Sequence, residues 1–194
     1  MKKITTKKIL EIKKPNLRAP ILKELRLRFS PRFFNSKRLS DKILRSIFEA
    51  ARWTPSGYNN QPWYFYWSPN GSNAYKNIKS CLSEKNDWAK TAPVFIVACY
   101  IDKNERGIIR YAQYDLGAAV ISMIIQAQSL GIYARQMGLF DQIKLQKLLR
   151  IPKKYTPYIV VAMGKIGDYT KIDEELLKRE LNKRERKIKV AEKI

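Results

Sequence analysis

Residues 54–65 read TPSGYNNQPWYF, a polar segment that runs directly into three aromatic residues. Pro55 and Pro62 restrict the backbone of this segment, and Gly57 would let a ligand approach the main chain closely. The side chain of Asn59 offers both a hydrogen-bond donor and an acceptor. Such a stiff, amide-rich loop is suited to the edge of a flat heterocycle with carbonyls and ring nitrogens. A well-made turn between a helix and a strand would use the same residues.

The composition excludes several kinds of site. The 194 residues include 39 Lys and Arg, 17 Asp and Glu and no His, which gives a formal net charge of +22. Without His, a Ser–His or Cys–His nucleophile pair and a His-ligated zinc cannot form. Cys81 and Cys99 are isolated, so we expect no metal site, no disulfide framework and two cysteines in the core. The longest apolar run, residues 116–125, is shorter than the ~20 residues of a membrane span. We therefore expect a soluble, cytoplasmic protein.

The chain is expected to form one domain with basic ends. Its length and its apolar fraction of 45% are typical of a single globular domain. Residues 1–38 carry thirteen basic and two acidic side chains. We therefore predict a basic N-terminal arm over residues 1–19, a central domain over residues 20–170, and a basic C-terminal helix and arm over residues 171–194.

Hydrophobic periodicity predicts an α+β arrangement. Apolar residues three and four apart favour helices, and β-branched apolar runs favour buried strands. The helix expected at 115–130 is apolar on nearly every side, so it should lie at the centre of the domain or be covered by a second subunit. The expected helices cover residues 20–28, 41–53 (with Ser40 as N-cap), 73–82, 115–130, 141–149 and the start of the tail from 171; the expected strands cover residues 64–67, 93–101, 132–137 and 156–164.

Two further segments have residues that suit a ligand. In RFSPRFF, residues 28–34, an extended backbone would project Arg28, Ser30 and Arg32 to one side, which suits a phosphate or a carboxylate. A solvated basic edge would show the same pattern. In ARQMGLFD, residues 134–141, a strand ends at Gly138 and a helix begins, so backbone N–H groups could point into a cleft. An ordinary strand-to-helix turn is the alternative.

In this order, the three segments resemble the nitroreductase family of FMN-dependent oxidoreductases. The family patterns R-x-S-x-[RK]-x-F, P-S-x-x-N-x-Q-P-W, A-P-V, D-x-G-x-A and Q-M-G-x-F-D are matched at residues 28–34, 55–63, 92–94, 115–119 and 136–141. The resemblance implies an α+β nitroreductase-like fold. Its central, mostly antiparallel sheet would be flanked by helices, with a long buried helix at a homodimer interface.

The resemblance also implies an FMN site at that interface. Arg28 and Ser30 would hold the phosphate, and Arg32 would approach the N1/C2-carbonyl end of the ring. The loop after residue 54 would reach the flavin bound mainly by the other subunit, and the backbone at Gly138 would donate to flavin N5. Phe29 stands where the family often has Arg or His, and Leu139 where many members have a second Gly. The implied cofactor-binding set is Arg28, Phe29, Ser30, Arg32, Pro55, Ser56, Gly57, Asn59, Gln136, Met137, Gly138, Arg184 and Arg186.

The implied reaction is a ping-pong hydride transfer. Hydride would pass from NADH or NADPH to flavin N5 and then to a nitroaromatic, a quinone or a similar small acceptor. The flavin would carry the chemistry, so no side chain need act as acid or base, and Arg32 and Gly138 would support it. Two alternatives stay open. One is a basic nucleic-acid-associated protein, which is disfavoured because no binding motif appears; the other is a flavin carrier or sensor without turnover.

Overall fold

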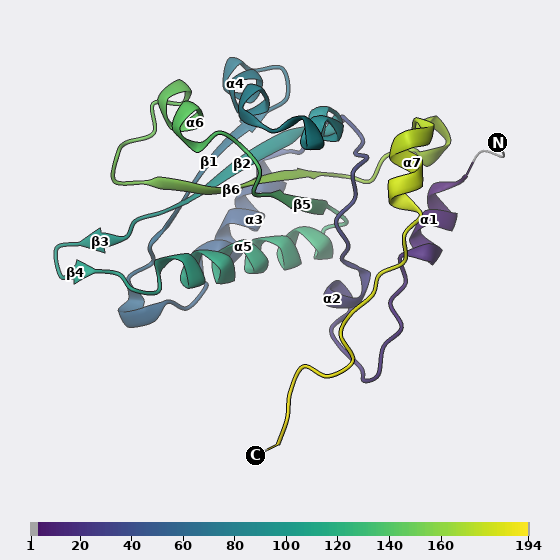
Figure 1. Cartoon of the computed structure of the whole chain (residues 1–194), viewed down its shortest axis with the longest axis horizontal. Coiled ribbons are helices and arrows are strands. Elements are labelled where there is room, and N and C mark those ends of the chain that lie inside the picture. Colours follow the sequence, from purple (N-terminus) through teal and green to yellow (C-terminus); the bar gives the residue numbers. More distant parts are fainter. Residues whose placement is uncertain (1–3, 194) are drawn as a thin grey trace.

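A four-stranded antiparallel sheet, in the order β1-β2-β6-β5, forms the centre of the computed structural model, which describes residues 4–193 (Figure 1). Its strands are β1 (Trp63–Pro69), β2 (Val94–Tyr100), β5 (Tyr133–Met137) and β6 (Thr156–Gly164). A separate two-residue hairpin pairs β3 (Lys103–Asn104) with β4 (Gly107–Ile108). The antiparallel α+β fold expected from the sequence is confirmed.

The sheet is covered on both faces, which explains why its central strand is apolar along its whole length. Val94, Ile96 and Ala98 of β2 belong to one hydrophobic core, whereas the alternate residues Phe95 and Val97 belong to a second core. Successive side chains of a strand point to opposite faces, so a central strand with two covered faces has no polar position.

One pair of helices covers each face (Figure 1). The helices α3 (Asp41–Arg52) and α5 (Ala112–Ser129) pack on the first face, and α4 (Asn73–Cys81), α6 (Gln142–Leu148) and the 3-10 segment η2 (Glu84–Thr91) pack on the second. Ser40 caps α3 through its hydroxyl, as predicted, and Asp141 caps α6 through its carboxylate. Cys81 and Cys99 are both free and buried, which confirms their place in the core.

The long helix α5 is not covered on all sides within one chain. Its residues Ala119, Met123 and Ala127 face the sheet and are fully buried. An opposite stripe, which we call the open α5 face, consists of Tyr114, Gly117, Ala118, Ile121, Ser122 and Ile125, all exposed or half-buried. Spacings of three and four residues place these side chains on one side of the helix. A single chain therefore leaves an apolar surface on its central helix.

The chain ends fold against each other and form a third, smaller core. The N-terminal arm predicted over residues 1–19 contains a helix, α1 (Thr6–Ile12), capped by Thr5. Ile9 of α1 is fully buried and belongs to a small core with Tyr169 and Leu177. Tyr169 begins the 3-10 segment η3 (Tyr169–Lys171), and Leu177 lies on α7 (Glu174–Glu180). The helix predicted at residues 20–28 is shorter, α2 (Lys23–Leu27), and no side chain caps its start. Within residues 4–193, no helix is both long and apolar enough to cross a membrane.

Candidate functional site

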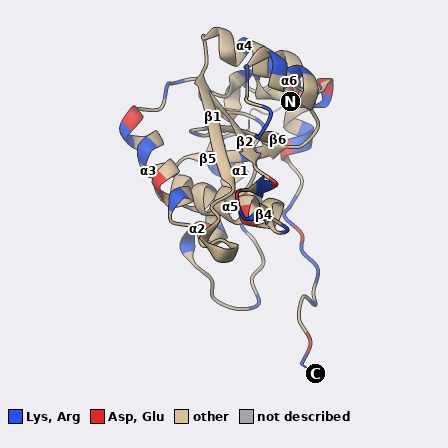
Figure 2. Ribbon diagram, turned by 90° about the vertical axis from the view of Figure 1, so that its left-hand side faces the viewer, with Lys and Arg blue, Asp and Glu red and all other residues tan. Residues whose placement is uncertain are grey.

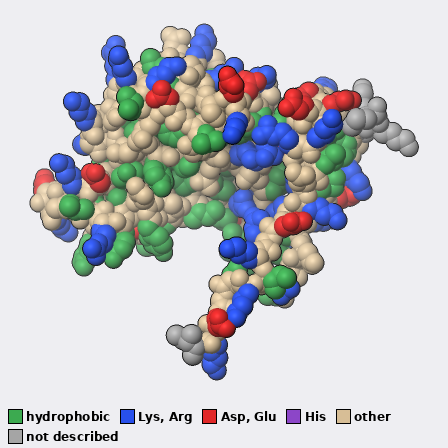
Figure 3. Space-filling view, in the orientation of Figure 1, with side chains coloured by type: hydrophobic (Ala, Val, Ile, Leu, Met, Phe, Trp, Pro, Cys, Tyr) green, Lys and Arg blue, Asp and Glu red, His purple; other side chains and the backbone are tan. Residues whose placement is uncertain are grey.

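A basic pocket of about 390 Å³ lies where the body of the protein meets the two terminal segments; we call it the anion pocket. It brings together six of the residues that the sequence singled out, from two segments about 150 positions apart. Figure 3 shows basic side chains gathered in this region, beside the hydrophobic surface over α5. The pocket is lined by Lys13, Arg28, Phe29, Ser30, Arg32, Arg135, Arg179, Asn182, Lys183, Arg184, Glu185 and Arg186.

The local backbone explains why Arg28, Ser30 and Arg32 share this pocket. Arg28, the C-cap of α2, has extended dihedral angles, φ −62° and ψ 124°. Burial then alternates along the chain: Phe29 and Pro31 are buried, whereas Arg28, Ser30 and Arg32 are half-buried. Phe29, the intervening residue, is buried against Tyr133, with ring centroids 5.1 Å apart. Alternate residues of an extended chain point to opposite sides, so burial of Phe29 directs its two neighbours outward.

The arginines of the anion pocket stand close together and partly out of water. Burial lowers the pKa of Arg28, and the charge of Arg186 lowers it further. Burial also lowers the pKa of Arg184, with smaller contributions from the charges of Arg28 and Arg186. Guanidinium groups nevertheless keep their charge at neutral pH. A bound anion would relieve this desolvation and repulsion, which is the property expected of a phosphate site.

Several of the cations are held by the protein itself. Arg184 donates to the backbone carbonyls of Arg26 at 2.7 Å and Lys13 at 3.2 Å, so it fastens the C-terminal segment to both N-terminal segments. Arg32 pairs with the buried Glu180, with 3.0 Å between Nη1 and Oε1. The pocket therefore has a fixed frame, in which Arg28 and Arg186 lack such an ion pair among the described residues.

Sequence reasoning missed four basic residues of the pocket, namely Lys13, Arg135, Arg179 and Lys183. Among them, Arg135 on β5 has the most extensive contacts. Its guanidinium donates to the Ser30 carbonyl and lies over the ring of Trp88, 5.3 Å from the centroid. Burial lowers the pKa of Arg135 to about 10, and the charge of Arg32 contributes. The sequence did contain a signal that could have pointed to Arg135. Arg135 shares a strand face with the apolar Tyr133 and Met137, and a charge on such a face needs a partner or a ligand.

The loop at residues 54–62 is a strained turn that a carboxylate holds in place. Its 3-10 segment η1 (Gly57–Asn59) begins a run in which Tyr58, Asn59 and Gln61 have φ of 52°, 55° and 45°. Residues with side chains seldom adopt this left-handed region, at a cost of about 1–3 kcal/mol each. The buried Asp115 accepts a hydrogen bond from the Gly57 N–H at 3.2 Å.

Side chains within the loop add to this support. The Ser56 hydroxyl accepts from the Gln61 N–H at 2.9 Å, and the Asn60 amide donates to the Gly57 carbonyl at 2.8 Å. Asn104 of the β3–β4 hairpin donates to the Asn60 side chain at 3.0 Å. The backbone conformation is thus fixed from inside the loop and from two neighbouring elements.

The loop does not line the anion pocket of its own chain. Asp115 fastens it at the N-terminal end of α5, whereas α2, which leads into Arg28, lies near the C-terminal end of that helix (Figure 1). The 18 residues of α5 span about 27 Å. One chain therefore separates Pro55, Ser56, Gly57 and Asn59 from the phosphate-binding candidates by roughly the length of its central helix.

The third predicted segment forms an open turn at the end of β5. Met137 is buried, while Gln136 and Gly138 are exposed. A Cβ atom added at Gly138 would meet only the Ile159 Cδ1 atom, at an ordinary 3.6 Å. Internal packing therefore does not require glycine here, and the open backbone face is free for a ligand. Gly138, Leu139 and Phe140 line a shallow hollow next to Cys81 and Leu82.

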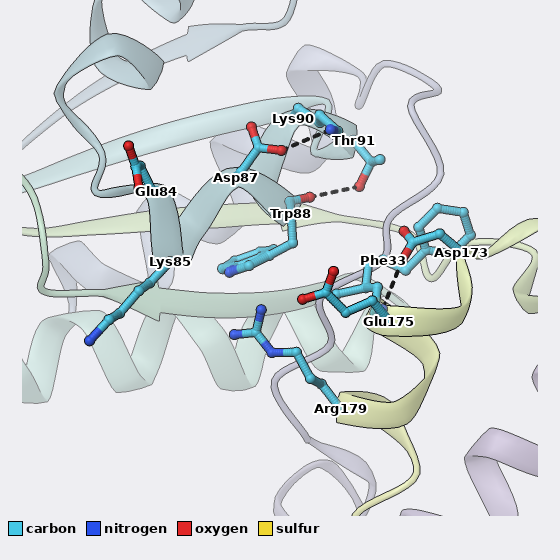
Figure 4. Close-up of a pocket in the computed structure, with 11 residues that line it drawn as sticks. Phe33, Glu84, Lys85, Asp87, Trp88, Lys90, Thr91, Asp173, Glu175 and Arg179 are labelled. Atoms are coloured by element: carbon cyan, nitrogen blue, oxygen red, sulfur yellow. Dashed lines mark hydrogen bonds and ion pairs between the residues drawn. The ribbon is translucent and has the colours of Figure 1, made fainter.

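A second cavity, of about 350 Å³, lies between η2 and α7 (Figure 4). Arg179 belongs to both cavities and extends from α7 toward Trp88 and Glu175. Acidic and basic side chains alternate around it, so it lacks the single sign of charge of the anion pocket. Its charged lining residues are Glu84, Lys85, Asp87, Lys90, Asp173, Glu175 and Arg179. None of the His, Cys, Asp or Glu side chains that the structure describes form a group of three or more that could hold a metal ion.

Comparison with known proteins identifies the family. The model of the family described as "Nitroreductase family" matches residues 25–87 and 76–165, more than half of the chain. The protein therefore belongs to the nitroreductase family. A solved structure, "The crystal structure of the oxidoreductase containing FMN", has a TM-score of 0.80 and 30% identity, covering 87% of this chain and 89% of its own.

The chain is also similar to other known proteins. A Mycolicibacterium smegmatis protein, "Uncharacterized 15.4 kDa protein in ask 5'region", is 32% identical over 112 residues, 58% of this chain and 76% of its own. An Archaeoglobus fulgidus protein, "Putative NADH dehydrogenase/NAD(P)H nitroreductase", is 28% identical over 150 residues, 74% and 83% of the two chains. A Bacteroides fragilis nitroreductase with bound FMN shares the fold, with a TM-score of 0.62 at 22% identity over 74% and 87% of the chains.

Replacing Asp115 with Ala should loosen the strained loop. The Gly57 N–H would lose its acceptor, a loss of about 1–3 kcal/mol, so hydrogen exchange of this amide should accelerate about tenfold or more. Ser129→Ala, at the exposed end of the same helix, is the control. Unchanged protection of Gly57 in a folded Asp115→Ala protein would show that the carboxylate does not hold the loop.

Proposed function

We propose that this protein is an FMN-dependent oxidoreductase that takes hydride from NADH or NADPH and delivers it to a small acceptor such as a nitroaromatic or a quinone. The single observation that carries the proposal is the anion pocket, where residues of two segments about 150 positions apart meet and basic side chains outnumber acidic ones. Membership of the nitroreductase family and the likeness to an FMN-containing oxidoreductase support the same function.

The residues of the pocket fit the phosphate end of FMN. Arg28 and Arg186 would pair with phosphate oxygens, the Ser30 hydroxyl would donate to them, and Arg184 would hold the C-terminal segment in place. Arg32 would carry its charge toward the ring. The orphaned Arg32 Nε, buried without a partner among the described residues, is a donor that a ligand could satisfy.

The ring of the cofactor would be contacted by backbone groups, and no side chain would act there as an acid or a base. At Gly138 the main chain could donate an N–H to the ring without a side chain in the way. When bound, FMN would accept hydride at N5 and pass it on, so the chain's task is to bind, to orient and to limit access of water. This task matches a sequence that has no His.

A homodimer would complete the site. The strained loop and the anion pocket lie near opposite ends of α5, and the open α5 face between them is apolar. Two chains that pack these faces antiparallel around a two-fold axis would bring the loop of one near the pocket of the other. Ser56, Gly57 and Asn59 would then contact the cofactor held by the partner.

Nucleic-acid binding has less support. Lys and Arg lie on helices on both faces of the sheet, including α3 and α6, and do not form one continuous stripe (Figure 2). The densest group of cations is the anion pocket, which is a recess and not an extended surface. A groove for a polyanion would instead align its cations along a path.

The first experiment is an absorption spectrum of the purified protein, before and after NADH or NADPH is added under nitrogen. Flavin bands, either as purified or after addition of FMN, should bleach with the reductant and return when a quinone or nitroaromatic is added, over many turnovers. Bleaching without sustained turnover would indicate a carrier or sensor. A protein that takes up no FMN would contradict the proposal.

Replacing Arg28 with Ala should weaken FMN binding. Loss of a charge-assisted contact of about 1.5–3 kcal/mol corresponds to roughly a tenfold to 100-fold higher Kd. Affinity for riboflavin, which has no phosphate, should change little, as measured by quenching of flavin fluorescence. Arg45→Ala, exposed on α3, is the matched control. Equal FMN affinity in the Arg28→Ala and wild-type proteins would place the phosphate elsewhere.

Replacing Ile121 with Asp should separate the subunits. Its side chain is 41% exposed in one chain, and a charge buried there in a dimer would be costly. Light scattering after size exclusion should give twice the chain mass of 22.7 kDa for the wild type and the single mass for the variant, with weaker FMN retention. Lys147→Asp, on the opposite face of the sheet, should stay dimeric. A wild-type monomer that binds FMN would refute the shared site.

A further inference from the structure

We propose that Glu180 is a positioning residue of the anion pocket, whose buried carboxylate fixes Arg32 in the orientation in which it would face bound FMN. The inference rests on the proposed function, since it takes the ligand to be FMN, with Arg28 on the phosphate and Arg32 toward the ring. Glu180 is the last residue of α7, and only 1% of its surface is exposed. Among the acidic residues in the part of the chain that the structure describes, only Glu180 and Asp115 are buried.

Both oxygens of this carboxylate are engaged. Oε1 accepts from Arg32 Nη1 at 3.0 Å, and Oε2 accepts from the Tyr169 hydroxyl at 2.7 Å. An ionised carboxylate is costly to bury unless its oxygens are paired in this way. Burial, together with the neighbouring charge of Glu180, raises the pKa of Tyr169 far above its usual value, so Tyr169 stays a donor.

The pair fixes one edge of Arg32 and leaves the rest of the group for a ligand. Within residues 4–193, the hydrogen bonds of Arg32 go through Nη1 alone, to Glu180 and, at 3.4 Å, to the Arg179 carbonyl. The Arg32 side chain is 21% exposed and lines the anion pocket. A guanidinium held at one edge is preorganised, so less of its conformational entropy is lost when it binds a ligand.

Glu180 also separates like charges. Burial lowers the pKa of Lys13, and the negative charge of Glu180 opposes this effect while the charges of Arg32 and Arg135 add to it. The same carboxylate opposes the lowering of the pKa of Arg135. The negative charge of Glu180 therefore reduces the repulsion among Lys13, Arg32 and Arg135, so that these cations can stay close together beside the pocket.

Glu180 and the residues that support it lie outside residues 25–165, the part of the chain that the family model matches. Tyr169 and Glu180 follow it, and α1, which precedes it, supports them: Thr6 Oγ1 accepts from the Tyr169 N–H at 3.2 Å and donates to the Gly167 carbonyl at 3.2 Å. Ile9 closes the same small core. The terminal segments thus supply a support for a residue of the family's own phosphate motif.

Glu180→Gln is the main test, because glutamine keeps the shape and removes the charge. Simple electrostatics predicts that the loss of a negative charge tightens binding of the anionic FMN, whereas loss of positioning predicts the opposite. We expect the Kd of FMN and the Kd of riboflavin both to rise about tenfold, because Arg32 would face the ring that the two flavins share. In an Arg32→Met background the same substitution should add less than about twofold, because Glu180 acts through Arg32. Glu174→Gln, exposed on the same helix, controls for net charge.

The outcomes separate the two proposals. A wild-type protein that binds FMN no better than riboflavin would refute the phosphate site itself. If the wild type prefers FMN, then tighter or unchanged FMN binding by Glu180→Gln would overturn the role of Glu180. The role of Glu180 would also be overturned if Glu180→Gln weakened FMN binding by the same factor in the wild-type and Arg32→Met proteins. Should Glu180→Gln fail to fold, Tyr169→Phe removes only one hydrogen bond of the carboxylate. A folded Tyr169→Phe protein should bind FMN about twofold to fivefold more weakly, and an unchanged FMN affinity would refute the positioning role.

Discussion

The site depends on the repulsion among guanidinium groups that the fold gathers in one partly desolvated place. Arg28, Arg32 and Arg135 come from the body of the protein, and Arg184 and Arg186 come from its C-terminal segment. Charges of one sign disperse unless something holds them, and here the holding groups are backbone carbonyls, one buried carboxylate and a small apolar core. The unfavourable energy that is left would favour the binding of an anion. The folding back of both chain ends is therefore part of how the pocket is made.

The long helix α5 separates the two parts of the proposed site within one chain. One of its faces completes a core against the sheet, and its other face stays open in a single chain. The strained loop is fastened near one end and the anion pocket lies near the other. A flavin mononucleotide is too short for one chain to hold its phosphate in the pocket and its ring against its own loop. The geometry of the helix is thus the physical reason to expect that two chains share each site.

Local sequence patterns predicted those parts of the fold that local forces decide. The sequence predicts Ser40 as an N-cap because a serine hydroxyl accepts well from the free N–H groups at a helix start, and Ser40 does cap α3. The helix α1 escaped prediction because seven residues with one buried apolar side chain show too little periodicity; Ile9 is buried by residues about 160 positions away. The pair of Arg32 and Glu180 spans 148 positions, so no local pattern could reveal it. The family resemblance grouped Arg28, Ser30, Arg32, Arg184 and Arg186, which line one pocket, but it did not predict Arg135 or the carboxylate that pairs with Arg32.

The strained loop shows why such a motif is a matter of backbone as much as of side chains. Tyr58, Asn59 and Gln61 all adopt left-handed dihedral angles, which together oppose folding by several kcal/mol. Such a conformation persists only where the surroundings over-determine it, and here Asp115, Ser56 and Asn104 fix the loop from three directions. A flexible polar loop of the same composition would have to be ordered at the moment of binding. A loop that is already ordered presents its amides at a fixed spacing, so it can recognise a rigid planar ring at a smaller entropic cost. The strained conformation, which is already present in the free protein, would therefore give the proposed site an ordered edge.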